Sequence, residues 1–98
     1  MYMVISVNRH RPGTGTVHAL VSDERHSVDV CNRYSLAFGP DDVFFGITPY
    51  AVIEATTDEG GSVLATVLVN IYSDKRPSPL VAVVVPVPAY VWESFQYV

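Results

Sequence analysis

Residues 62–73 read SVLATVLVNIYS and are the most informative segment of the chain. Their β-branched and apolar side chains favour a β-strand. Alternate residues of a strand point to opposite faces, and both faces are apolar here. Val63, Ala65, Val67, Val69 and Ile71 share one face, and Leu64, Leu68 and Tyr72 share the other. The segment is therefore either a central strand of a two-layer core or a strand whose second face is covered by another chain. We favour the second interpretation, with a copy of the same protein as the simplest cover.

Turn-forming residues divide the rest of the chain into short segments of a similar kind. The expected strands are residues 2–8, 15–21, 26–31, 34–38, 43–47, 50–57, 62–73, 80–87 and 89–97. Across a loop at 58–61, Val52 would face Val67 and Ile53 would face Thr66. The sequence therefore predicts one all-β domain over residues 1–98, a small sandwich or partly open barrel of antiparallel strands.

Two of these segments have a helical alternative. Proline is accepted at the first position of a helix, so Thr48-Pro49 could begin a helix that runs to about residue 56. Pro88 could begin a C-terminal helix in which Val91, Trp92, Phe95 and Val98 share one face. An α+β fold with a short C-terminal helix is therefore the alternative to the all-β fold. Pro86 and Pro88 also mark an edge strand or a crossing, since proline has no N–H to donate to a sheet.

Composition narrows the classes of protein that fit. The chain has 98 residues, 49% of them hydrophobic and 16% charged, which is typical of one folded domain and not of a disordered chain. The net charge of −4 argues against electrostatic binding to nucleic acid, and no segment fits a transmembrane helix. Cys31 is the only cysteine, so no intrachain disulfide can form. A reducing intracellular compartment is the simplest expectation.

One histidine–carboxylate pair has the chemistry of a catalytic site. If residues 22–25 form a turn, His18 faces Asp29 across the first hairpin. A carboxylate that fixes one imidazole nitrogen leaves the other nitrogen free to act as a base. No Gly-x-Ser-x-Gly motif surrounds any serine. His18 and Asp29 are therefore candidates for catalysis, and a surface cross-strand pair is the simpler interpretation.

His10, His18 and His26 recur every eight residues, a spacing that raises the question of a metal site. In the expected register His18 and His26 point to opposite faces of their sheet, and His10 lies in a loop. We therefore expect no metal site and no cofactor.

Residues 8–16 form a basic segment that contains two glycines. Exposed backbone N–H groups beside Arg9 and Arg11 could hold a phosphate or carboxylate, with Gly13 and Gly15 allowing close approach. The segment lacks the Gly-Lys-Ser/Thr ending of a P-loop. It is the best candidate for an anion site, and a flexible hairpin connection is the alternative.

Four aromatic residues gather at the C-terminus, at Tyr90, Trp92, Phe95 and Tyr97. No basic residue follows Arg76, and a nucleic-acid groove would need positive charge. Tyrosine and tryptophan are enriched in protein interfaces, so we predict that these four residues bind a protein partner. Residues 62–73 are the expected edge for self-association.

These observations favour a non-catalytic protein-binding module that forms a homo-oligomer and covers a partner's surface. Inhibitors, accessory proteins and assembly proteins of phages and mobile elements are often small domains of this kind, a comparison that rests on size and the absence of motifs. The alternative is a small β-barrel enzyme or anionic-ligand binder that uses the His18–Asp29 pair and the Arg9–Thr16 segment.

Overall fold

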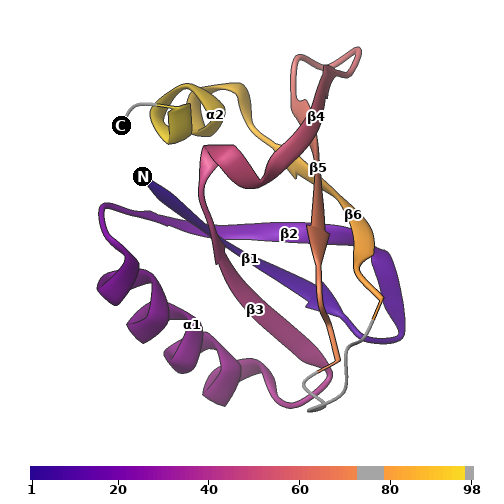
Figure 1. The fold of residues 1–98 in the computed structure, drawn as a ribbon. Helices are drawn as coiled ribbons and strands as arrows, with labels where there is room; N and C mark the ends of the chain where they lie inside the picture. Colours follow the sequence, from indigo (N-terminus) through magenta and orange to yellow (C-terminus); the bar gives the residue numbers. More distant parts are fainter. Residues whose placement is uncertain (73–78, 97–98) are drawn as a thin grey trace.

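The computed structural model describes residues 1–72 and 79–96, which form a β-rich fold with two α-helices (Figure 1). The elements in chain order are β1 (Tyr2–Asn8), β2 (Arg11–Val21), α1 (Glu24–Phe38), β3 (Asp42–Ile47), a 3-10 turn η1 (Pro49–Ala51), β4 (Val52–Thr57), β5 (Val63–Val69), β6 (Val81–Val87) and α2 (Ala89–Gln96). None of the helices in this part of the chain is both long and apolar enough to cross a membrane.

The six described strands form one mixed sheet in the order β3-β1-β2-β6-β5-β4. Neighbouring strands are antiparallel except for β2 and β6, which run parallel and pair only at Thr14 and Val84. β3 and β4 lie at opposite ends of the sheet, so it does not close into a barrel. The expectation of antiparallel strands is therefore confirmed for four of the five pairings and wrong for β2 and β6.

The two halves of this sheet pack against each other and enclose the core. β5 and β6 cross in front of β1 and β2 in Figure 1. Met3, Ile5 and Val7 of β1 belong to the same buried cluster as Val83 and Val85 of β6. The side chain of Phe95 in α2 completes this cluster and is 0% exposed. The core thus lies between the β3-β1-β2 half and the β6-β5-β4 half.

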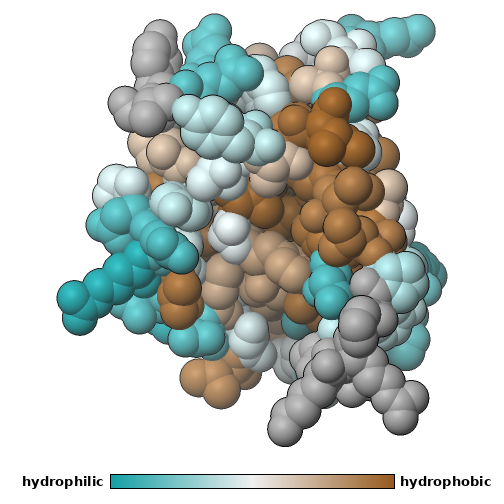
Figure 2. Space-filling model, viewed as in Figure 1, coloured by the Kyte–Doolittle hydropathy of each residue, from teal (hydrophilic) through white to brown (hydrophobic). Residues whose placement is uncertain are grey.

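The second face of β5 and β6 is open to solvent. Buried and more accessible residues alternate along both strands, as expected for strands with only one face in the core. Leu68 is 44% exposed and Val84 is 36% exposed. Figure 2 shows hydrophobic side chains gathered on the molecular face that carries these strands. The structure thus explains the two apolar faces of residues 63–69, of which one is core and one is surface.

Helix α1 replaces two predicted strands, 26–31 and 34–38, and with them the first predicted hairpin. The backbone N–H of His26 donates to Asp23 Oδ1 at 2.7 Å, so Asp23 caps the helix. Gly39 ends it with a φ of 94°, a conformation that glycine adopts at little cost. The valines of this segment suggested a strand, but the two caps favour a helix. β1 and β3 also supply a surface against which this helix packs. The all-β prediction is wrong here.

Helix α2 confirms the helical alternative for the C-terminus and corrects the predicted strand at 89–97 over residues 89–96. The backbone N–H groups of Val91 and Trp92 both donate to the carbonyl oxygen of Pro88, at 3.0 and 2.9 Å. Pro88 therefore directly precedes the helix, and its carbonyl oxygen accepts the first hydrogen bonds of α2. Residues 97 and 98 lie outside the described residues.

The second predicted hairpin is present as β4 and β5. The predicted pairing of Val52 with Val67 is confirmed, whereas Thr66 pairs with Glu54 because a register shift follows Val52. A 3-10 turn, and not a helix to residue 56, precedes β4. β5 lies between β4 and β6. The expectation that residues 62–73 form an edge for self-association is therefore wrong, since both edges of β5 are already paired.

Candidate binding groove along strand β2

The structure separates the predicted catalytic pair. His18 lies on β2, and Asp29 is an exposed residue of α1. The predicted hairpin that would have aligned them does not exist, because residues 24–38 are helical. His18 and Asp29 therefore do not form the predicted pair. His18 instead lies where β2, β1 and α1 meet.

His18 is the extra residue of a β-bulge. Ile5 pairs with Val17 and Val4 pairs with Ala19, which leaves His18 without a partner on β1. Such a bulge redirects the side chain of the unpaired residue. His18 Nε2 lies 2.7 Å from the Oγ of the buried Ser6. The bulge thus directs the imidazole toward the space between the sheet and α1.

Three aromatic rings from α1 and β3 surround the His18 imidazole. Their centroids lie 5.0 to 5.5 Å from its own, and the residues are Tyr34, Phe38 and Phe44. Burial lowers the pKa of His18, and the negative charge of Asp42 opposes this shift. The neutral imidazole is therefore favoured, with Ser6 satisfying Nε2. This arrangement fixes α1 on the sheet, and the buried position of Ser6 limits its access to a substrate.

The predicted anion site is mostly a strand and is flanked by acidic residues. β2 begins at Arg11, so residues 11–16 belong to the sheet. Gly15 is buried and pairs with Val7. Gly13 is exposed. Gly13 and Gly15 are thus both strand residues, and neither lies in a flexible loop.

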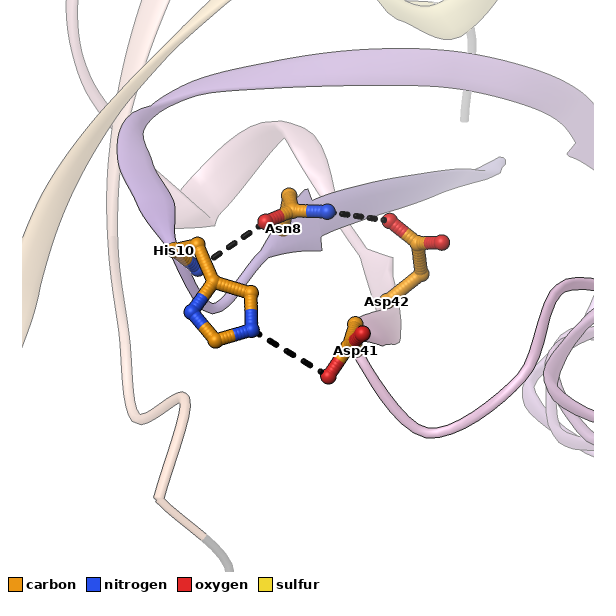
Figure 3. A network of polar contacts seen from close by, with 4 residues as sticks. All are labelled: Asn8, His10, Asp41 and Asp42. Carbon is orange, nitrogen blue, oxygen red and sulfur yellow. Dashed lines mark hydrogen bonds and ion pairs between the residues drawn. The ribbon is translucent and has the colours of Figure 1, made fainter.

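The turn that carries Arg9 is bound to the start of β3 (Figure 3). The backbone N–H of Arg9 donates to the Asp41 carbonyl oxygen at 2.8 Å, and His10 Nε2 lies 3.3 Å from Asp41 Oδ1. Asn8 Nδ2 donates to Asp42 Oδ1 at 3.3 Å, and the backbone N–H of His10 donates to Asn8 Oδ1. The two carboxylates place negative charge beside the turn that carries Arg9, which disfavours an anion bound to this turn.

The three histidines belong to separate places in the fold. His10 contacts Asp41, His18 lies under α1, and His26 is in the first turn of α1. Within residues 1–72 and 79–96, no group of three or more histidine, cysteine, aspartate or glutamate side chains is arranged to hold a metal ion. Cys31 is half-buried, and this burial raises the pKa of its thiol.

The predicted aromatic binding residues have different environments. Phe95 is fully buried in the core, and Trp92 packs against that core with its ring centroid 5.7 Å from that of Phe95. Phe95 is thus a core residue, which corrects its prediction as a contact residue. Tyr90 is 76% exposed and is the surface residue of the group. Tyr97 lies outside the described residues.

Two prolines follow the point at which β6 pairs with β2. Val84 is the residue of β6 that pairs with β2, and position 86 is a proline with no N–H. A proline cannot donate to a ladder, and Val84 is followed by prolines at 86 and 88. Pro88 lies at the end of β6, and α2 begins directly after it.

A groove follows the edge of β2 that this break leaves open. Its volume is about 650 Å³, and its lining on β2 consists of every residue from Thr14 to Leu20. A hollow on one face of a strand would contact only alternate residues, so seven consecutive lining residues place the groove along the strand edge. The opposite wall consists of Pro86, Pro88, Tyr90 and Val91. None of the groove residues carries an aspartate, glutamate, lysine or arginine side chain.

A second hollow lies on the other side of the same strand, against α1. Its volume is about 480 Å³. The lining residues are Ala19 and Val21 of β2 with His26, Val30, Arg33, Tyr34 and Ala37 of α1. Ala19 lines both hollows. The open edge of β2 therefore lies between two hollows. One is the groove described above, which we also call the hollow beneath α2, and the other is this hollow beneath α1.

The sequence contained one signal for this site, the prolines at 86 and 88. They predict an edge or crossing, but they do not indicate which strand is left with an open edge. Pairing β2 with β6 is a contact between distant segments that periodicity does not reveal. No family model, curated protein or solved structure matches this chain. Its function is therefore inferred from the geometry of the groove.

Proposed function

We propose that this chain is a non-catalytic protein-binding module that takes up an extended segment of a partner protein along the open edge of β2. The observation that carries the proposal is the run of consecutive residues, Thr14 to Leu20, lining one groove. An inhibitor, accessory or assembly protein could act in this way by covering a segment that its partner needs.

Strand addition is the mode of binding that suits such an edge. On this side β2 pairs with β6 only at Thr14, so the following residues can offer backbone N–H and C=O groups to an incoming chain. Backbone hydrogen bonds then provide affinity, and neighbouring hollows receive side chains. The five residues from Thr16 to Leu20 span about 17 Å at about 3.3 Å each, which accommodates a segment of five or six residues.

The shape of the site favours a single extended segment over a folded second copy. The edge is recessed, since α2 and its preceding prolines form one wall and α1 borders the hollow on the other side. A second copy that approached through its own β2 would bring its two helices into the same space. Homo-oligomer formation through this edge is therefore not part of the proposal.

Selection of phage-displayed random dodecapeptides on the immobilised full chain tests this function. Peptides that are enriched are synthesised and added to the protein, and hydrogen exchange is measured for individual amides. We expect slower exchange within Thr16–Leu20, with Ile53–Thr57 of β4 as the unaffected control edge. Failure to enrich any peptide, or binding that leaves the Thr16–Leu20 amides unchanged, would overturn the proposal.

N-methylation of the enriched peptide tests the role of its backbone. In a bound strand, alternate residues direct their N–H groups toward β2. Methylating one alternate set of residues should weaken binding about tenfold, and methylating the other set should have a smaller effect. Equal effects from the two sets would contradict strand addition.

A further inference from the structure

Resting on the proposed function, we infer that the bound segment alternates apolar side chains with at least one acidic side chain, which is directed to Arg33. The partner class is thus an extended, acidic–apolar peptide segment. The inference follows from the different chemistry of the two hollows on either side of the β2 edge.

The two hollows lie where successive side chains of an added strand would point. β2 has α1 on one side, where His18 meets Tyr34, and the core with α2 on the other, where Leu20 packs. A strand that continues the sheet from β2 has the same two sides, so its odd and even residues enter different hollows. Ala19 lines both hollows, so they adjoin the same stretch of the edge.

The hollow beneath α2 suits apolar side chains. Its walls include Val17, Leu20 and Val91, together with two prolines and the ring of Tyr90. It contains no charged side chain, so a charged group placed there would lose water without gaining a partner of opposite charge. Apolar residues of the segment are therefore expected on this side.

The hollow beneath α1 suits a carboxylate above an apolar base. The helix residues of this hollow share one face of α1, so the basic ones and the apolar ones line the same hollow. They are His26, Val30, Arg33 and Ala37. Arg33 makes no ion pair within 4.0 Å among the residues that the structure describes. No aspartate or glutamate lines this hollow, and its one permanent charge is the arginine. The guanidinium can therefore bind a carboxylate through paired N–H donors.

The dodecapeptides selected on the native chain test this inference directly. We expect aspartate or glutamate at one or more alternate positions between apolar residues. Replacing that acidic residue by glutamine in the synthetic peptide should weaken binding about fivefold, as expected for a partly exposed ion pair. Arg33→Glu should abolish the preference for the acidic peptide over its lysine counterpart, and Arg25→Glu is the control with the same change in charge on an exposed position of α1.

Two results would separate failure of the inference from failure of the proposed function. Enriched peptides that slow exchange at Thr16–Leu20 but show no acidic preference, or that bind Arg33→Glu as well as the native chain, would overturn the inference and leave strand addition intact. The absence of any peptide that protects this edge would overturn both. Circular dichroism of Arg33→Glu confirms that the variant is folded, and Arg33→Gln provides a second variant that removes the charge without reversing it.

Discussion

At the scale of single residues, two close contacts hold α1 against the sheet. One is the His18 imidazole beside Ser6 and the aromatic rings. The other is Gly46 of β3, where an added Cβ would lie 2.6 Å from Ser27 Oγ. Ser27 is itself held, since its Oγ donates to the Glu24 carbonyl oxygen at 2.8 Å. Both contacts depend on the identity of one residue, and each leads to a prediction.

The first prediction concerns the pH dependence of stability. Burial places the pKa of His18 in the folded state below its value in the unfolded chain, which is about 6.5. The unfolded chain therefore takes up this proton first as the pH falls. The contribution of His18 to stability is complete above the unfolded pKa and is lost as the pH falls through the folded pKa. We expect the melting temperature to fall more between pH 7 and pH 5 in the native chain than in His18→Gln. Identical pH profiles would contradict this prediction.

The second prediction concerns the close approach of α1 and β3. Gly46→Ala should lower the free energy of unfolding by about 1–3 kcal/mol, because the short Ser27 side chain cannot move away without a shift of the helix. Gly13→Ala is the matched control, since a Cβ there has no atom within 4 Å. Urea denaturation of both variants measures the difference. A loss of equal size in both would show that the Ser27 contact is unimportant.

At the scale of elements, proline sets where the sheet opens. Pro86→Val places an N–H in β6 just beyond Val84, the residue that pairs with β2. In this variant we expect the Thr16–Leu20 amides to exchange more slowly and binding of the selected peptides to weaken, because β6 then competes for the edge of β2. Pro40→Val, in the connection between α1 and β3, is a control proline outside the groove. Unchanged exchange at Thr16–Leu20 and unchanged peptide binding would show that proline does not cause the opening.

The elements also show which parts of the fold were accessible from sequence. β1, β3 and the β4–β5 hairpin follow from short runs of apolar, β-branched and aromatic residues bounded by turn residues, which are local properties. α1 does not, because Val28 and Val30 favour a strand locally, while the packing of Tyr34 against Phe44 favours a helix. Asp23 and Gly39 were the available helix signals. The groove itself depends on the β2–β6 pairing, which joins residues far apart in the chain.

At the scale of the whole molecule, the inner and outer faces of β5 and β6 should respond differently to substitution. Val85 is fully buried between the halves of the sheet, so Val85→Ala should cost about 2–3 kcal/mol of unfolding free energy. Leu68 is 44% exposed on the outer face, and Leu68→Ala should cost less than about 1 kcal/mol. Thermal or urea unfolding measures both. A larger loss at Leu68 than at Val85 would contradict the arrangement of the two faces.

Self-association, expected from the apolar pattern of residues 62–73, stays a prediction for the outer face alone. Native mass spectrometry at several protein concentrations measures it, and Leu68→Lys supplies the comparison. If a second copy covers this face, the oligomer of the native chain should dissociate in the variant, because a buried lysine would lack a partner. A native chain that is monomeric at all concentrations would contradict this prediction and show that no second copy covers this face.

The single parallel pairing between the two halves also sets an order of events during synthesis. Thr14 and its partner Val84 are 70 positions apart, so the N-terminal half leaves the ribosome well before β6 does. The core side chains of β1 therefore stay uncovered until the residues that pack on them have been synthesised. These are Met3, Ile5 and Val7, covered later by Val83, Val85 and Phe95. Until β6 and α2 emerge, the nascent chain carries an uncovered apolar surface, which makes aggregation a greater risk during synthesis than after folding.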